Sequence, residues 1–344
     1  MAATDVLTLT PAGLYCVPGD FHIDPTRKVP RALITHGHSD HARPGHGAVM
    51  ATRETLAIMA LRCGEAFAGS TQVAKLGETT QIGDAAVSFH PAGHVLGSAQ
   101  IAIEALGTRI VVSGDYKRTR DPTCLPFEPV ACDLFITEAT FGLPVFHHPD
   151  VTHEIAKVLA SATLFPERAH LIGAYSLGKA QRIAALIHAA GWERPIYIHG
   201  AMQKLMDFYA SEGIEIGEIR KVATADRGKL GGEIIIAPPS ALNDLWSRKF
   251  PDPVTAFASG WMRIRARARQ NGITLPLVIS DHADWNELCA TIRDTECSEV
   301  WVTHGEEDAL VHWAQTQGLA AQPLHLLGYG EEDEENGPAD EPAP

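Results

Sequence analysis

The chain has 344 residues, 45% of them hydrophobic and 20% charged, which is the profile of a folded protein with a sizeable core. No apolar run approaches the roughly 20 residues that a membrane-spanning helix needs. The first residues lack the basic and apolar regions of a secretory signal, and the six cysteines are scattered without a Cys-x-x-Cys pair. These features argue against a membrane protein and a disulfide-stapled secreted domain, and they predict a cytoplasmic protein.

The net charge is −14, from 42 acidic and 28 basic residues. Half of that excess lies in residues 331–344, a stretch rich in Glu and Pro with seven carboxylates and no Lys or Arg. We expect residues 329–344 to form a disordered acidic tail. The overall charge therefore does not exclude a nucleic-acid partner.

Five short apolar segments rich in Val and Ile end abruptly in His, Asp or Glu, and their length and composition predict buried strands. In chain order they are residues 31–35 before His36, 109–113 before Gly114-Asp115, 133–137 before Glu138, 277–280 before Asp281-His282, and 300–303 before His304. Any one of these polar residues could be a hydrogen-bonded turn residue. Because polar function gathers at the carboxyl ends of strands in layered α/β folds, the five together predict a site at one sheet edge.

The densest of these positions is the segment His36-Gly-His38-Ser-Asp40-His41. Neutral imidazole and carboxylate are the ligands of Zn²⁺ and related ions, at roughly 2.0–2.2 Å. Alternate residues beyond a strand, such as His36 and His38, can point the same way. A single histidine is more often a hydrogen-bonded core residue, but this dense cluster of imidazoles and carboxylate indicates a metal site.

Further ligands must come from elsewhere in the chain, because Zn²⁺ takes about four. His94 lies in the turn Pro91-Ala-Gly-His94-Val-Leu-Gly-Ser98, whose glycines let the backbone approach a ligand closely. Asp115 ends a predicted strand where it could bridge two ions, and His304 could complete a second site. The pattern predicts the two-metal centre of a hydrolase.

These motifs resemble those of a known family. The His-x-His-x-Asp-His cluster, the Gly-His-x-x-Gly-Ser turn at His94 and the segment Ser113-Gly-Asp115 resemble the metallo-β-lactamase fold. Three further segments resemble motifs of its nucleic-acid-processing β-CASP branch: Thr137-Glu138-Ala-Thr-Phe-Gly142, Ser280-Asp-His282-Ala-Asp284 and Thr303-His304-Gly-Glu306. Residues 34–46 and Ser259-Gly-Trp-Met-Arg263 are similar to the bacterial ligase-associated DNA exonucleases.

The resemblance implies an α/β fold, namely a metallo-β-lactamase αββα sandwich with an inserted β-CASP α/β cap domain. Residues 1–150 would form the first part of the metallo-β-lactamase domain, and residues 151–272 the cap. Residues 273–328 would then return to the metallo-β-lactamase domain, ahead of the tail at 329–344.

The resemblance also implies the site, which would hold two divalent metal ions, zinc or alternatively manganese. One ion would be bound by His36, His38 and His94, and the other by Asp40, His41 and His304, with Asp115 between them. Asp24 would support this cluster from behind. The catalytic candidates are Asp40, His282 and Glu138: His282 would protonate the leaving oxygen or stabilise its charge, and Glu138 would orient His282.

One segment of the predicted cap is close to a phosphate-binding loop. Gly173-Ala-Tyr-Ser-Leu-Gly178-Lys179-Ala180 precedes a predicted helix, but Ala180 stands where a P-loop has Ser or Thr, so we expect no ATPase. Lysine and free backbone N–H groups at a helix N-terminus still suit a phosphate, so Ser176, Lys179 and Arg182 could grip a nucleic-acid backbone. A tight strand-to-helix turn without a ligand is the alternative.

Four arginines alternate in the segment Trp261-Met-Arg263-Ile-Arg265-Ala-Arg267-Ala-Arg269. On a strand they would line one face and form a basic stripe that could follow phosphates. A solvated edge, or pairing with acidic neighbours, is the equal alternative. Ser259 and Arg263 join Ser176 and Lys179 as candidate contacts to nucleic-acid phosphates.

The leading hypothesis is a metal-dependent phosphodiesterase that acts as a DNA exonuclease, 5′ to 3′ on single strands, in DNA repair. The resemblance implies association with a DNA ligase and a helicase. The same centre acting on RNA is the alternative, favoured by His304 because RNA-processing relatives carry histidine there. A small-molecule metallo-hydrolase is a third hypothesis, and a non-catalytic binding module is a fourth.

Overall fold

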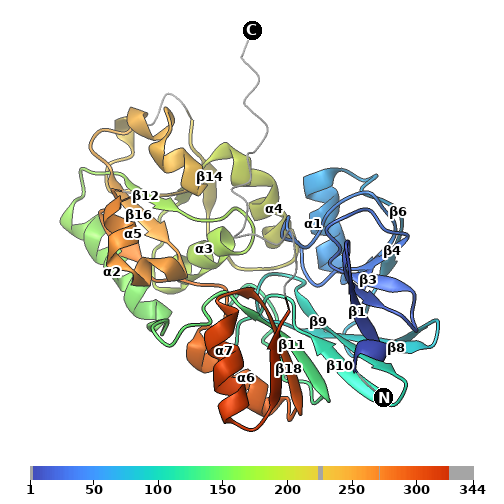
Figure 1. The fold of residues 1–344 in the computed structure, drawn as a ribbon. Coiled ribbons are helices and arrows are strands. Elements are labelled where there is room, and N and C mark those ends of the chain that lie inside the picture. The colour runs from blue at the N-terminus through green and yellow to red at the C-terminus, as the bar shows by residue number, and fades with distance from the viewer. Residues whose placement is uncertain (1–2, 224–227, 271, 325–344) are drawn as a thin grey trace. The chain divides into compact units, whose positions relative to one another are not determined.

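The computed structural model of the chain describes residues 3–223, 228–270 and 272–324 (Figure 1). These residues divide into two compact units: residues 3–147 with 281–324, and residues 148–280. The second unit is therefore encoded between two parts of the first. The predicted acidic tail at 329–344 lies outside the described residues, as does the end of the segment predicted to return at 273–328.

The first unit contains two mixed sheets. The first sheet has six strands in chain order: β1 (Leu7–Thr10), β2 (Gly13–Cys16), β3 (Phe21–Ile23), β4 (Arg31–Leu33), β5 (His46–Ala51) and β6 (Ala68–Val73). The second has seven strands in the spatial order β19 (Ala320–Pro323), β18 (Glu299–Gly305), β11 (Leu134–Ala139), β10 (Thr108–Val112), β9 (Ala99–Ala105), β8 (Ala85–Pro91) and β7 (Thr79–Ile82).

Strands β10, β11 and β18 are adjacent and parallel, so their carboxyl ends meet at one edge of the second sheet. Asp115, Glu138 and His304 lie at these ends, as the sequence predicted for each strand. His36 follows β4, which belongs to the other sheet. The expectation that one sheet carries the whole site is therefore wrong, and two sheets contribute to it.

The two sheets pack face to face, with helices on both outer sides. Alternate residues of a strand face opposite ways: Leu33 and Ile110 join the core between the sheets, whereas Ala32 packs beside Met59 of α1 (Arg53–Cys63). Phe135 joins the outer core beneath α6 (Trp285–Asp294) and α7 (Glu307–Thr316). The layers of this unit thus run helix, sheet, sheet, helix.

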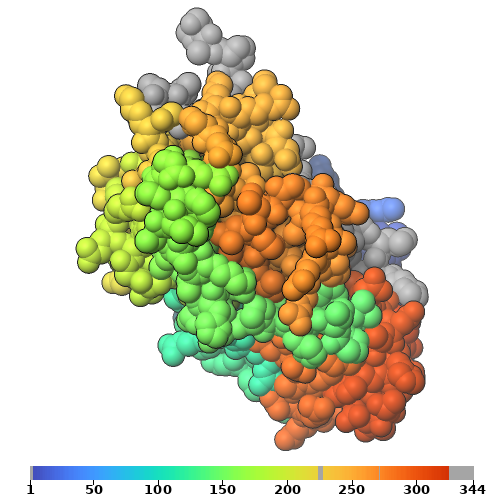
Figure 2. All heavy atoms as spheres, turned by 90° about the vertical axis from the view of Figure 1, so that its left-hand side faces the viewer, coloured from blue at the N-terminus to red at the C-terminus, as the bar shows by residue number. Residues whose placement is uncertain are grey.

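The second unit is built on one six-stranded parallel sheet. Its spatial order is β14 (Ile219–Lys221), β13 (Ile196–Ile198), β15 (Ile234–Ala237), β12 (His170–Gly173), β16 (Val254–Ala258) and β17 (Leu275–Leu277). Its helices are α2 (Val151–Leu164), α3 (Lys179–Ala189), α4 (Gln203–Ser211) and α5 (Arg265–Gln270). Figure 2 shows the face of this unit on which the green segment with α2 and the orange segment with α5 reach the surface.

The core of the second unit is aliphatic. Buried side chains of the sheet, such as Ile172 and Ile236, pack against Val158 of α2 and Ile183 of α3. Strands buried on both faces read as continuous apolar runs, which explains the sequence Ile-Ile-Ile-Ala of β15. Within the described ranges, no helix is long and apolar enough to cross a membrane.

The strand predicted over residues 277–280 is not present. β17 ends at Leu277, and the chain passes from the second unit to the first between residues 280 and 281. Val278 N donates to the carboxylate of Glu154 at 3.0 Å, so this amide is used by a side chain and not by a sheet. His282 therefore lies on a connecting segment and not at a strand end.

The strand considered for the segment with the alternating arginines is also absent: the segment is helical. Ser259 Oγ accepts a hydrogen bond from Trp261 N at 3.3 Å and caps a 3₁₀ turn, Gly260–Arg263, which is followed by α5. Arg and Ala both favour helix, so their alternation carries no preference for a strand. Arg263, Arg265 and Arg269 are exposed around this helical segment.

Candidate metal centre

The segment His36–His41 forms a loop directly beyond β4. Its ligand-type side chains are buried, from His36 with no exposed surface to Asp40 with 9%. Arg62 of α1 donates to the Gly37 carbonyl at 2.6 Å and ties the loop to the helix. The loop is thus held in place on its outer side by a residue that no motif indicated.

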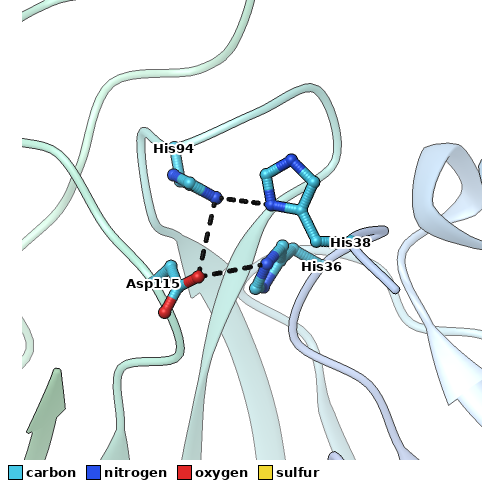
Figure 3. Close-up of side chains that lie close together, drawn as sticks. All are labelled: His36, His38, His94 and Asp115. Atoms are coloured by element: carbon cyan, nitrogen blue, oxygen red, sulfur yellow. Dashed lines mark hydrogen bonds and ion pairs between the residues drawn. The ribbon is translucent and has the colours of Figure 1, made fainter. Parts of the chain in front are cut away.

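A first group of side chains converges from three loops of the first unit (Figure 3). It comprises His36, His38, His94 and Asp115, each offering one ligand atom within 4.8 Å of the others. Asp115 Oδ2 lies 3.4 Å from His36 Nε2 and 3.8 Å from His94 Nε2. His94 Nε2 lies 3.0 Å from His38 Nδ1. Ligands held tetrahedrally at roughly 2.0–2.1 Å from an ion are about 3.3 Å apart, so this spacing fits one metal ion.

Two atoms of this region support a cation independently. Within the described part of the chain, His36 Nε2 and Asp40 Oδ1 are buried and have no hydrogen-bond partner. Buried polar atoms are normally hydrogen-bonded, and leaving one unsatisfied is costly. A neutral ring nitrogen and a carboxylate oxygen both offer lone pairs, so these residues fit a divalent metal.

A second group shares Asp115 with the first. It comprises His41, Asp115 and His304, whose ligand atoms again lie within 4.8 Å of one another. His41 Nε2 is 3.5 Å from Asp115 Oδ2 and 3.6 Å from Asp40 Oδ2. His304 has a φ of 54°, a left-handed conformation that is uncommon outside glycine and that clusters at functional sites. Asp115 Oδ2 is therefore within reach of both groups.

Asp24 supports the second group from behind. Its Oδ2 lies 2.8 Å from His41 Nδ1 and accepts a hydrogen bond from Thr35 Oγ1 at 2.6 Å. Its Oδ1 accepts from Thr35 N at 2.8 Å. A carboxylate on Nδ1 leaves Nε2 of the same ring available to a metal ion. The sequence indicated a supporting role for Asp24, whereas no role was predicted for Thr35.

We predict that Asp24→Asn weakens metal binding without removing a ligand. The amide holds the His41 ring less firmly, so the affinity for the metal falls by roughly 10–100-fold, as for other partners of ligating histidines. Zinc titration against a fluorescent chelator measures this, and Asp84→Asn, at an exposed position, is the matched control. Equal zinc affinity in the two variants would contradict the supporting role.

His94 is oriented by the segment after the second unit. Its Nδ1 donates to the Asp281 carbonyl at 2.9 Å, which fixes the tautomer that leaves Nε2 unprotonated toward the first group. The two positions are 187 residues apart in sequence. Neither composition nor local spacing signals such a contact.

His282 and Glu138 form a buried pair beside both groups. His282 Nδ1 lies 3.0 Å from Glu138 Oε2 and 3.1 Å from Oε1, and Glu138 Oε1 also accepts from Tyr116 N at 2.8 Å. The His282 ring centroid is 4.7 Å from that of His94. Thr140 Oγ1, at 3.4 Å from His282 Nδ1, is a further neighbour. It lies in the segment Thr137–Gly142, but no role was predicted for it.

Burial keeps three of the clustered rings uncharged. It lowers the pKa of His36 well below its usual value, and it lowers the pKa of His94 and of His304 to about 3. The neutral ring is the form that binds a metal. These three rings are therefore ready to act as ligands at neutral pH.

The remaining groups are governed by their neighbours. Burial lowers the pKa of His41, but Asp115 and Asp40 outweigh it and raise that pKa to about 10. A divalent cation beside the same carboxylates favours the neutral ring instead. For Glu138, burial raises the pKa, but His282 outweighs it and the pKa falls to about 2. Glu138 is therefore a carboxylate that can accept the His282 Nδ1 hydrogen.

The predicted phosphate contacts all belong to the second unit. Ser176 and Lys179 lie where β12 leads into α3, and Ser259 and Arg263 lie where β16 leads toward α5. β12 and β16 are neighbouring parallel strands, so both segments leave the same edge of the sheet. Lys179 is buried, with its Nζ 4.5 Å from the centre of the Tyr175 ring, whereas Arg263 is exposed.

The four-layer fold and the buried cluster of His and Asp are the features expected of a metal-dependent hydrolase of the metallo-β-lactamase fold class. No family model matches the chain. The chain is 28% identical over 387 residues to "Ribonuclease TTHA0252" of Thermus thermophilus, covering 90% of the chain and 89% of that protein. It is 27% identical over 314 residues to a "Probable DNA ligase" of Opitutus terrae, covering 90% of the chain but only 30% of that protein.

One further related sequence and one solved structure are also similar to the chain. "Cleavage and polyadenylation specificity factor subunit 3-I" of Arabidopsis thaliana is 22% identical over 88% of the chain and 55% of its own length. The solved structure of a protein of unknown function from Enterococcus faecalis has a TM-score of 0.60 at 13% identity, covers 87% of the chain and 80% of its own, and supports the fold alone. These similarities, which extend over most of the chain, support the β-CASP family of metallo-β-lactamase-fold, metal-dependent nucleases.

Proposed function

We propose that the protein is a metal-dependent phosphodiesterase that cleaves DNA as a 5′-to-3′ exonuclease on single strands, in DNA repair. The observation that carries this proposal is that two groups of buried ligand atoms share Asp115 and lie beside the His282–Glu138 pair. Two ions next to a positioned proton donor are the arrangement that phosphodiester hydrolysis uses.

The proposed cofactors are two zinc ions, with manganese as the alternative. The proposed ligands are His36, His38 and His94 for the first ion, Asp40, His41 and His304 for the second, and Asp115 between them. When bound, such ions supply a hydroxide at neutral pH and stabilise negative charge on the attacking and leaving oxygens.

The chain's own residues then handle the protons. Asp40 Oδ1, buried and without a hydrogen-bond partner within the described ranges, can accept a hydrogen bond from the attacking water. His282 donates a proton to the leaving oxygen while Glu138 holds its Nδ1. Because Glu138 stays ionised, it stabilises the protonated ring before transfer.

We assign the second unit to the β-CASP cap, which contacts the nucleic-acid backbone. Ser176, Ser259 and Arg263 lie on segments that leave one edge of its sheet, and Lys179 adds positive charge beneath the turn. Arg265 and Arg269 extend the exposed positive charge along α5. Such charge suits a phosphate backbone on a chain whose overall charge is negative.

We predict that replacing Arg263, Arg265 and Arg269 with Gln reduces the salt dependence of single-strand binding. Each lost phosphate contact lowers the slope of log K against log salt by about 0.7, so the triple variant should lose about 2. Fluorescence anisotropy at several salt concentrations measures the slope. The matched control replaces three exposed lysines, Lys28, Lys75 and Lys204, with Gln. An equal change in both triple variants would mean that net charge, and not this surface, sets the slope.

RNA is the second candidate substrate. The likeness to a protein named a ribonuclease, over 89% of its length, favours RNA. The likeness of nearly the whole chain to part of a protein named a DNA ligase favours DNA and a functional link to ligation. Because the chain spans under a third of that second protein, its activity is not carried over directly.

The deciding experiment offers zinc- or manganese-loaded protein end-labelled DNA and RNA of one sequence. We expect DNA to shorten stepwise from the 5′ end. Faster cleavage of RNA would instead select the second candidate, and internal cuts would exclude an exonuclease. If neither polymer is cleaved when both metal positions are occupied, the proposed nuclease function is overturned.

A further inference from the structure

Lys117 is a buried lysine two residues beyond Asp115. Only 4% of its surface is exposed, and lysine is almost never buried to this extent unless it is paired. Its Nζ donates to Glu287 Oε2 at 2.9 Å and to the backbone carbonyl of His282 at 3.1 Å. This ammonium group is thus hydrogen-bonded to the segment that carries the proposed proton donor, His282.

The second partner of Lys117, the carboxylate of Glu287, is itself held by several hydrogen bonds. Glu287 and Asp284 form a capping box at the start of α6: Asp284 Oδ1 accepts from Glu287 N at 3.0 Å, and Glu287 Oε2 accepts from Asp284 N at 3.1 Å. Glu287 Oε1 also accepts from Thr119 N at 2.6 Å. Lys117 therefore joins the His282 carbonyl to a carboxylate that is fixed from two directions.

Three successive residues of the connecting segment, Asp281, His282 and Ala283, are each hydrogen-bonded through a backbone group. The Asp281 carbonyl accepts from His94 Nδ1 at 2.9 Å, and Ala283 N donates to the Tyr116 carbonyl at 2.7 Å. The His282 carbonyl lies between them and is held by Lys117. Since this segment belongs to no strand or helix, these contacts take the place of a sheet ladder.

We propose that Lys117 is a positioning residue that sets the direction of the His282 ring toward Glu138 and the reacting phosphate. This inference rests on the proposed function and assigns Lys117 a part in the same site. Asp115, Tyr116 and Lys117 then act in succession: the first faces both ligand groups, the second holds Glu138 through its N–H, and the third fixes His282. A displacement of about 1 Å at a reacting group can cost roughly 100-fold in rate.

A double-mutant cycle tests this. Lys117→Met in the zinc-loaded full chain should lower kcat by on the order of 10–100-fold, with KM and zinc content unchanged. In a His282→Ala background the same substitution should cost less than about twofold, because a residue that acts through His282 has nothing left to position. Lys75→Met, at an exposed lysine, is the control in both backgrounds. Equal fold losses with and without His282 would overturn the proposal.

Two further measurements distinguish failure of the role proposed for Lys117 from failure of the proposed nuclease function. In the crystal structure of the Lys117→Met variant, His282 Nδ1 should lie beyond hydrogen-bond distance of Glu138; a contact retained at 3.0 Å would overturn the proposal whatever the activity. If Lys117→Met does not fold, Glu287→Gln keeps the lysine but weakens its anchor and should show a smaller kcat loss of the same kind. A wild-type protein that cleaves no nucleic acid would instead refute the proposed function, while the crystal structure would still decide the role of Lys117.

Discussion

Asp115→Asn should lower the rate of nucleic-acid hydrolysis by on the order of 10³-fold and remove metal from both positions of the centre. Asp115 Oδ2 lies 3.4 Å from His36 Nε2 and 3.5 Å from His41 Nε2, so one oxygen serves both groups of ligand atoms. An amide oxygen carries no full negative charge and cannot offset two cations. Elemental analysis of the dialysed variant should find less than half the wild-type metal.

The metal content of a His304→Ala variant distinguishes loss of one metal ion from loss of both. His304 belongs to only one of the two groups, so His304→Ala should lose metal from one position and keep the other. Asp84→Asn, an exposed carboxylate of the same unit, should lose none. If Asp115→Asn kept as much metal as Asp84→Asn, the oxygen between the groups would not bridge them, and the two-ion assignment would fall.

Three residues of the candidate centre could be predicted together because the strands that carry them are parallel neighbours in one sheet. β10, β11 and β18 each end in a titratable residue, and parallel pairing places those ends at one edge whatever the loops between them do. The apolar runs and the residue that ends each one are both visible in a linear pattern. Asp115, Glu138 and His304 were therefore predictable together.

The supporting residues were not predictable in this way. Lys117 reaches His282 across 165 positions of sequence, and its role depends on a capping box at the start of α6. His282 itself was expected at a strand end, but its segment crosses between two units, where no ladder exists to leave a period in the sequence. Local patterns report local structure, so contacts made by connecting segments escape them.

His282→Ala should abolish most of the cleavage while leaving the metal bound. The ring is held by Glu138 at 3.0 Å and lies beside His94, but the proposed ligand sets are complete without it. Loss of a general acid costs roughly 10²–10⁴-fold in rate. We expect a fall of this size in kcat on end-labelled DNA, with zinc content within a tenth of the wild type by elemental analysis.

The leaving group makes this test specific. A substrate whose leaving group is a nitrophenolate departs without a proton, so His282→Ala should cleave such a phosphodiester at nearly the wild-type rate, whereas Asp115→Asn should fail on both substrates. His153→Ala, at an exposed histidine, should affect neither. If His282→Ala lost equal activity on both substrates and half its metal, His282 would be a ligand, and the proton on the leaving oxygen would need another source. A loss confined to the DNA substrate would assign that proton to His282, because only there does the departing oxygen need one.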